Sequence, residues 1–236
     1  SISEEQKDEI VEIYGLDRDK IINVGGGYNQ NIFYPPEEKT YADKIRLAFC
    51  GKIDPSKGVY ELIEAYKSLG LEDVTLDIIG TPIGENKEKI KRYIGDDTSI
   101  RVYNVKNQVA LGEEFRKKDI FILPSYYEGL GLVAIEALAC GLYVVVTEIE
   151  ALRSLLGDEI NKSGVIKYVK APRIYDTDKP VKEDLPAFKE RLKEAILEQI
   201  NKVRERKDYH RDVEDKIRAL SWEGLVERMN NFIHSI

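Results

Sequence analysis

The chain has 236 residues, of which 42% are hydrophobic and 33% charged, and its formal net charge is −7. This composition predicts a globular protein with a sizeable core and argues against intrinsic disorder. The negative charge disfavours a general nucleic-acid binder, because such proteins usually present basic surfaces.

No apolar run approaches the roughly 20 residues that cross a bilayer, and no signal-peptide pattern opens the sequence. We therefore expect a cytoplasmic protein without a transmembrane segment; peripheral association of a longer protein with the inner membrane face is an alternative. Cys50 and Cys140 stand among apolar residues. They are interpreted as small buried side chains, with a reactive or paired thiol as the alternative.

The first elements in chain order are a short helix and a strand. Ser3 and Gln6 have the spacing of a capping box, and apolar residues then recur at helical spacing as far as Gly15. The apolar residues 21–24 (IINV) predict a strand that leads into the Gly25 to Gly27 turn.

Beyond residue 44, strand and helix patterns alternate. Nearly continuous apolar runs predict strands, and amphipathic segments between them predict helices. The strands are expected at 45–51, 74–80, 99–105, 119–125 and 143–148, and the helices at 59–69, 87–95, 110–118 and 132–140. Apolar strands that alternate with helices indicate an α/β fold with a doubly wound, Rossmann-like parallel sheet.

The last third of the chain divides into two parts. Residues 161–186 are polar and contain prolines, which favours a long surface loop. From Ala187 onward the pattern is helical to the end of the chain. The two histidines, His210 and His234, lie in this helical tail, so a metal site or a histidine-based triad is not expected.

Three unusual turns follow strands, and in a parallel sheet such turns line the ligand-binding edge. The first is Gly25 to Gly27 and the second runs from Gly51 to Gly58. In the second, Lys52 and Lys57 precede a helix, where ammonium groups and helix N–H groups together favour a phosphate. The alternative is a pair of solvated loop lysines.

The third turn has the sequence SYYEGLGL and ends in a helix. Gly129 and Gly131 permit close backbone approach, and Glu128 would lie at the mouth of a cleft. Glu136 falls inside the apolar helix, where its carboxylate either reaches the cleft, with ribose hydroxyls as partners, or faces solvent. The two acids do not resemble a hydrolase pair, whose carboxylates usually face each other from different elements.

Four sequence blocks resemble the C-terminal, donor-binding domain of retaining GT-B glycosyltransferases, of the glycosyl transferases group 1 (family 4) type. INVGGGYNQNIF is similar to the first loop of that family, and GKIDPSKGVYELIEAY to its phosphate loop. LPSYYEGLGLVAIEALACG matches its glutamate signature, and SWEGLVERM its terminal helix. The resemblance extends from about Ile21 to the end.

The resemblance implies a role for each matching position. Lys52 and Lys57 would hold the diphosphate of the donor, Glu128 the transferred sugar, and Glu136 the ribose. With Lys52, Lys57 and Glu128 taken as catalytic, the expected donor-binding residues are Gly26, Gly27, Gly51, Gly129, Leu130, Gly131, Leu132 and Glu136. The lysines and the turn amides would stabilise the departing diphosphate. No metal or other cofactor is expected.

Several positions depart from the pattern of the family. Lys52 stands in place of the usual arginine, and Tyr143 in place of a proline. Gly26 and Asn29 replace Asn and Asp in the first loop, and Glu150, Ala151 and Ser154 replace a glycine pair and a glutamate.

The resemblance implies that residues 1–20 are a lead-in helix from a missing N-terminal domain and that 21–236 form the nucleotide-sugar donor-binding domain. The expected function is retaining transfer of a hexose from a UDP- or GDP-sugar, inactive without the N-terminal domain, which would hold a sugar or lipid acceptor. The alternatives are a sugar-nucleotide epimerase and a non-catalytic scaffold of the same fold.

Overall fold

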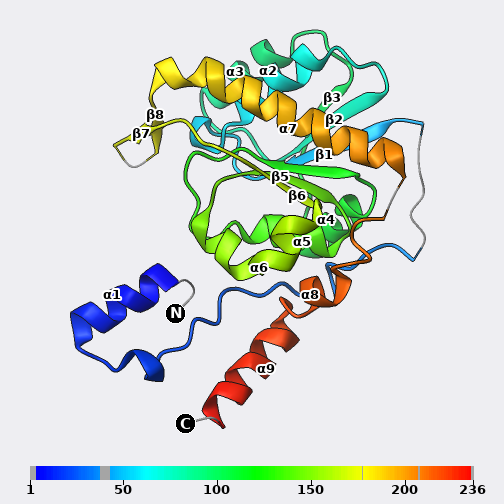
Figure 1. Cartoon of the computed structure of the whole chain (residues 1–236). Coiled ribbons are helices and arrows are strands. Elements are labelled where there is room, and N and C mark those ends of the chain that lie inside the picture. The colour runs from blue at the N-terminus through cyan, green and yellow to red at the C-terminus, as the bar shows by residue number, and fades with distance from the viewer. Residues whose placement is uncertain (1–3, 38–42, 177, 207, 235–236) are drawn as a thin grey trace.

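The computed structural model describes residues 4–37, 43–176, 178–206 and 208–234. Their main feature is a six-stranded sheet, with strand order β3-β2-β1-β4-β5-β6 and parallel pairing throughout (Figure 1). The strands are β1 (Ile45–Cys50), β2 (Val74–Ile79), β3 (Ile100–Tyr103), β4 (Ile120–Leu123), β5 (Tyr143–Thr147) and β6 (Ile166–Val169).

Helices cover both faces of this sheet. One layer contains α2 (Val59–Leu69), α3 (Asn86–Ile94) and α7 (Leu185–Glu205). The other contains α4 (Gln108–Phe115), α5 (Leu132–Ala139), α6 (Glu150–Ser163) and α8 (Glu214–Arg218). The sheet lies between the two layers in Figure 1. This is the doubly wound, Rossmann-like α/β fold that the alternating pattern predicts.

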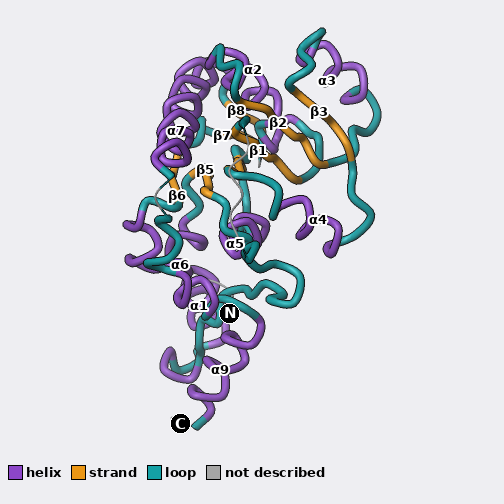
Figure 2. The backbone as a smooth tube through the Cα atoms, turned by 90° about the vertical axis from the view of Figure 1, so that its right-hand side faces the viewer, coloured by secondary structure: helices purple, strands orange, loops and turns teal. Residues whose placement is uncertain are grey.

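Two helices lie outside these layers. They are α1 (Glu4–Tyr14) and α9 (Trp222–Ile233). Figure 2 shows both at the end of the molecule opposite α2 and α3. The predicted end of α1 is confirmed, since Gly15 follows it with a φ of 63°. Ser3 of the predicted capping box lies outside the described residues.

The alternation of strand side chains explains why one sheet supports two cores. In β1, Leu47 and Phe49 pack with α2 and α7, while Ala48 faces the α5 side. In β5, Val145 and Val144 divide in the same way. Side chains in a strand alternate between the two faces, so a strand buried on both sides is apolar at most positions. The exception in β2 is the buried Asp77, which is paired with Arg101 and Lys118.

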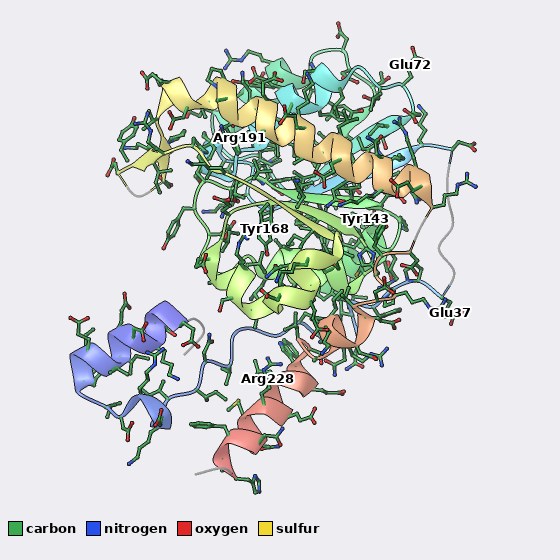
Figure 3. The ribbon with its side chains drawn as sticks, in the orientation of Figure 1. Glu37, Glu72, Tyr143, Tyr168, Arg191 and Arg228 are labelled. Atoms are coloured by element: carbon green, nitrogen blue, oxygen red, sulfur yellow. The ribbon has the colours of Figure 1, made fainter. Side chains whose placement is uncertain are left out.

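The prediction of a strand at residues 21–24 is wrong. These residues form no regular secondary structure and are half-buried. The carbonyl of Val24 accepts a hydrogen bond from Arg228 Nη2 of α9, at 3.1 Å, rather than from a neighbouring strand. Figure 3 labels Arg228 on α9, which extends away from the sheet.

The prediction of a loop over residues 161–186 is also wrong in part. The segment begins within α6, contains β6 at the edge of the sheet, and continues into a two-stranded hairpin of β7 (Ile174–Tyr175) and β8 (Lys179–Pro180). An edge strand needs few apolar residues: Ile166 and Val169 are buried in β6, whereas Lys167 pairs with Glu198 of α7 at 2.5 Å. The polar residues of β6 therefore masked its signal.

The helical tail is confirmed in the described residues, but it is interrupted between α7 and α8 and again between α8 and α9. α7 ends at Glu205, and Arg206 adopts a left-handed conformation with a φ of 54° before the chain turns into α8. Ser221 then caps α9, since its Oγ accepts a hydrogen bond from the N–H of Gly224 at 3.2 Å.

Candidate functional site

The second and third turns leave the carboxyl ends of β1 and β4, which are neighbours at the centre of the sheet. From β1 the chain builds outward to β2 and β3, and it then returns to place β4 on the other side of β1. This reversal is the topological switch point, where open α/β sheets bind their ligands. Two of the three turns that sequence reasoning selected therefore flank the crevice that the fold itself favours.

The second turn is rigid because its own side chains hold it. Asp54 caps a 3-10 turn, and its Oδ1 accepts hydrogen bonds from the N–H of Ser56 at 2.9 Å and from Ser56 Oγ at 2.8 Å. Burial alone would raise the pKa of Asp54, but these bonds and the charges of Lys52 and Lys57 lower it. The ionised Asp54 thus orders the backbone from which both lysines project.

The third turn packs directly onto the second. The N–H of Tyr126 donates to the carbonyl of Ser56 at 2.9 Å. Gly58, at the start of α2, approaches Pro124 so closely that a Cβ would stand 2.1 Å from the Pro124 carbonyl oxygen. This close approach fixes the position of Lys57, the residue before Gly58, relative to Glu128.

Lys57 and Glu128, which are 71 positions apart in sequence, meet in the site. Lys57 Nζ donates to Glu128 Oε1 at 2.7 Å, and the exposed fractions of the two side chains are 25% and 19%. Ser125 Oγ donates to the same oxygen at 2.8 Å. The carbonyl of the buried Ser125 in turn accepts from Thr147 Oγ1, at the end of β5, at 2.7 Å.

Lys52 lies on the same turn but is not part of this contact. Its side chain is exposed, and it makes no hydrogen bond or ion pair within the described ranges. Its charge nevertheless lowers the pKa of Asp54, as does the charge of Lys57. A free ammonium group beside a paired one leaves the second turn able to receive an anion.

The glycines of the third turn open the start of α5. Gly131 has a φ of 71° and precedes the first helical residue, Leu132, with no side chain capping the helix. Nothing lies within 4 Å of the position that a Cβ of Gly129 would occupy. The unsatisfied N–H groups at the start of a helix attract negative charge, so this end of α5 suits a phosphate. Leu130 is buried beneath it.

The first turn completes the arrangement from another part of the chain. A Cβ on Gly26 would stand 2.6 Å from a methyl of Leu130 and 2.7 Å from one of Leu132, so Gly26 lies against the third turn. Gly27 packs in the same way against Trp222 of α9. At the end of β1, the N–H of Gly51 donates to the carbonyl of Ile79 on the neighbouring strand, at 3.0 Å.

Glu136 lies inside α5 and does not face open solvent. Burial raises the pKa of its carboxyl group to about 7, and its carboxylate has no hydrogen-bond or ion-pair partner in the described part of the chain. Burial, with the charge of Glu136 as a second cause, raises the pKa of Cys50 to about 12. The charge of Glu136 also acts on Cys140, at the end of α5. These effects favour neither edge of the sheet, and the placement of Glu136 in the cleft stays a prediction.

Sequence reasoning missed the residues that hold the site together. Ser125, Thr147 and Asp54 had no assigned role, although Asp54 before a proline is a turn signal. The contact of Thr147 with Ser125 depends on the pairing of β4 with β5, which no local pattern encodes.

Tyr143, a departure from the family pattern, lies far from these turns at the amino end of β5. Its backbone N–H donates to the carbonyl of Asp119 at 3.0 Å, a bond that a proline would lack. Its ring packs against His210 with centroids 5.0 Å apart. Figure 3 labels Tyr143 within the sheet. This departure from the family pattern therefore lies at the edge of the sheet opposite the switch point.

A cavity of about 470 Å³ also lies at that opposite edge, where β1 and β4 begin. Arg46, Asp119 and Cys140 are among its lining residues, and none of the predicted donor-site residues is. Burial raises the pKa of Cys140 to about 12, which fits a structural thiol. The candidate site is instead formed by the turns at the carboxyl edge.

Within the described ranges, no cluster of three or more His, Cys, Asp or Glu side chains is arranged to hold a metal ion. The same ranges contain no helix with the length and apolar character that a bilayer crossing requires. The expectation of donor binding without a metal stays a prediction.

Comparisons with known proteins identify the family and the fold. The model of the family described as Glycosyl transferases group 1 matches residues 31–173. A D-inositol 3-phosphate glycosyltransferase 2 of Catenulispora acidiphila is 27% identical over 194 residues, which are 74% of this chain and 45% of the relative. A D-inositol 3-phosphate glycosyltransferase of Streptomyces bingchenggensis is 30% identical over 184 residues, or 70% of this chain and 40% of the relative. The chain spans less than half the length of these two relatives.

Solved structures show the same fold. A glycosyltransferase from Rickettsia africae superimposes with a TM-score of 0.75 at 18% identity, covering 98% of this chain and 61% of that one. HepE of Anabaena, solved in complex with UDP and glucose, has a TM-score of 0.71 at 12% identity, covering 100% and 62%. The chain belongs to the glycosyl transferases group 1 family, and its fold is that of the Rossmann-like C-terminal domain of GT-B glycosyltransferases.

Proposed function

We propose that this domain binds the nucleotide-sugar donor, a UDP- or GDP-sugar, for retaining transfer of a hexose to an acceptor. The observation that carries the proposal is the convergence of the second and third turns at the switch point. There, Lys57 contacts Glu128, Lys52 lies on the same turn, and the start of α5 is uncapped. Cationic groups and free helix N–H groups suit a diphosphate, and a carboxylate beside them suits sugar hydroxyls.

Each part of the donor has a matching group. Lys52, Lys57 and the amides at Gly131 and Leu132 would hold the diphosphate and stabilise it as it departs. Glu128 would accept hydrogen bonds from the hexose. At the other end, Glu136, a half-buried carboxylate without a partner among the described residues, would accept the ribose hydroxyls. The remaining glycines, Gly26, Gly27, Gly51 and Gly129, and Leu130 shape the crevice.

We further propose that turnover needs a preceding domain that holds the acceptor, with residues 1–20 as the segment that leads from it. Apolar side chains recur at helical spacing on the outer face of α9, where they are exposed. They are Trp222, Val226, Met229 and Ile233. Ile13 and Tyr14 of α1 are exposed as well. Such a set is unusual on a free surface and fits coverage by a further domain.

Isothermal titration calorimetry with UDP, GDP, UDP-glucose and GDP-mannose tests the proposal. Wild-type protein is expected to bind at least one of these nucleotides, and Lys57→Ala is expected to weaken binding about tenfold or more, since it removes a charged hydrogen bond. Glu136→Ala should weaken it as well. Lys162→Ala, which removes an exposed lysine paired with Asp158 on α6, serves as the control and should have no effect.

The alternatives predict different outcomes. A scaffold domain would bind none of the nucleotides at millimolar concentration, or would bind them equally well after Lys57→Ala and Glu136→Ala. An epimerase would convert UDP-N-acetylglucosamine when the longer protein is incubated with it in the absence of an acceptor, whereas a transferase would leave the sugar configuration unchanged.

A further inference from the structure

Lys57 and Glu128 neutralise each other in the free protein. Their 2.7 Å contact joins the ammonium group assigned to the diphosphate with the carboxylate assigned to the sugar. Both side chains are largely shielded from solvent, and Ser125 Oγ holds the same carboxylate oxygen at 2.8 Å. A donor must therefore be accommodated by a charge pair that already exists.

The geometry of the pair leaves room for an intact sugar nucleotide. Lys57 and Ser125 both donate to Oε1 of Glu128, whereas Oε2 has no partner in the ranges that the structure describes. A sugar hydroxyl can donate to Oε2 without displacing Lys57. The lysine ammonium group carries three donors, so it can keep its bond to Glu128 and add one to a phosphate. Both members of the pair are thus satisfied by the complete donor.

A nucleoside diphosphate without its sugar meets a different environment. It has no hydroxyl to donate to Oε2, and its terminal phosphate carries an additional negative charge. With the diphosphate on Lys57, this phosphate would approach the carboxylate of Glu128, and like charges at such separations repel. The carboxylate would also compete with the phosphate for the ammonium group.

We propose that Glu128 discriminates between the intact sugar nucleotide and the nucleoside diphosphate that remains after transfer, by competing with the terminal phosphate for Lys57. This inference rests on the proposed function. It makes Glu128 a specificity-determining residue whose paired state favours release of the spent nucleotide.

Calorimetry on the whole chain with UDP, UDP-glucose, GDP and GDP-mannose tests this competition. Glu128→Gln keeps the shape of the side chain and removes its charge. It is expected to tighten binding of the nucleoside diphosphate about fivefold, the scale of a partly exposed charge interaction, and to weaken binding of the sugar nucleotide. The ratio of the two affinities therefore moves in favour of the diphosphate.

Glu159→Gln is the matched control. It removes the same charge from an ion pair with Lys216, at 3.0 Å, that joins α6 to α8, and it should leave both affinities unchanged. Circular dichroism and thermal unfolding establish that each variant is folded. Glu128→Ala replaces the glutamine variant if the latter is misfolded.

Two results would contradict different statements. If the wild-type protein binds nucleotides and the affinity ratio is the same in Glu128→Gln, or both affinities fall equally, the competition between Glu128 and the terminal phosphate is wrong while the proposed function stands. If the wild-type protein binds none of the four nucleotides, the proposed function itself fails.

Discussion

Glu136 is the residue whose ionisation matters most for the behaviour of the domain near neutral pH. It stands in a helix that is otherwise apolar, and burial raises the pKa of its carboxyl group from the model-compound value of 4.5 to about 7. A charged carboxylate without a partner in such surroundings is destabilising. The position therefore links the stability of the free protein to pH, and a ribose hydroxyl is the partner that we propose for it.

The first prediction concerns this linkage. The pKa of Glu136 is higher in the folded than in the unfolded protein, so the folded state binds the proton more tightly, and the stability that this contributes is present below pH 4.5 and is lost as pH rises through 7. Relative to Glu136→Gln, the free energy of unfolding of the wild-type protein should fall by up to roughly 3 kcal/mol between pH 4.5 and 8.

Urea unfolding of the two proteins at several pH values in that range measures the difference between their free energies of unfolding. Because the other titrating groups are common to both proteins, their contributions largely cancel. A difference that is independent of pH would show that Glu136 is solvated in the folded protein.

At the level of single elements, α2 shows how one helix can carry two glycines for different reasons. Gly58 and Gly70 cap its two ends, and both adopt left-handed conformations, with φ values of 63° and 62°. A Cβ on Gly58 would stand 2.1 Å from the carbonyl oxygen of Pro124, whereas nothing lies within 4 Å of a Cβ on Gly70. The two sites therefore share backbone strain and differ in contact.

The second prediction uses this pair as variant and control. Gly70→Ala should cost about 1 kcal/mol, the price of a left-handed alanine. Gly58→Ala carries the same cost and must also push the third turn away, so it should lose at least about 2 kcal/mol more and should weaken nucleotide binding. Urea unfolding and calorimetry measure both effects. Equal losses of stability in the two variants would contradict the close approach of the turns.

The elements also show how far the sequence predicts the fold. β1 to β5 are confirmed, and the central strands β1, β2, β4 and β5 were recognisable because strands buried on both faces are mostly apolar. The edge strand β3 was found from its alternation with helices, whereas β6, at the other edge, was missed although the run Val165 to Val169 contains three β-branched residues. The apolar residues 21–24 misled because half-burial beside α9, rather than strand pairing, accounts for them.

The candidate site was predictable in its parts and not in its contacts. Turns after apolar strands, glycines and lysines before helices are local signals, so Lys57 and Glu128 could be selected one by one. Their pairing depends on β4 lying beside β1 rather than beside β3, a consequence of strand order that single-sequence patterns do not encode. The roles assigned to the predicted residues stay predictions until nucleotide binding is measured.

On the scale of the whole molecule, the first turn is held by the far end of the chain. The N–H of Trp222 donates to the carbonyl of Tyr28 at 2.9 Å, and that of Tyr28 donates to Leu220 at 3.3 Å, which forms an isolated bridge between Tyr28 and Ser221. Arg228 adds bonds to the carbonyls of Val24 and Ala219. The C-terminal segment thus fixes the position of Gly26 against the third turn.

The third prediction tests this long-range support. Arg228→Met keeps much of the apolar stem and removes both bonds, so residues 24–28 should exchange their amide hydrogens faster and nucleotide binding should weaken, while β1 to β5 stay protected. Hydrogen-exchange mass spectrometry resolves the segments. Arg204→Met is the control. It removes an arginine of α7 that pairs with Asp73, and it should change neither the exchange at residues 24–28 nor nucleotide binding. Unchanged exchange at residues 24–28 in the Arg228 variant would show that α9 does not hold the first turn through this side chain.

The bridge between Tyr28 and Ser221 also sets the order in which the protein can be completed during synthesis. The residues of β1 to β6 leave the ribosome before Leu220 does, so the sheet and its core with α2 and α7 can form while the first turn is still unattached. The core on the α5 side is completed later, by Val213, Ile217 and Leu220. The contacts that hold the first turn form only when Ser221 and α9 have emerged. A nascent chain with α9 still inside the ribosome would therefore have a formed sheet, yet nothing would hold its first turn against the third.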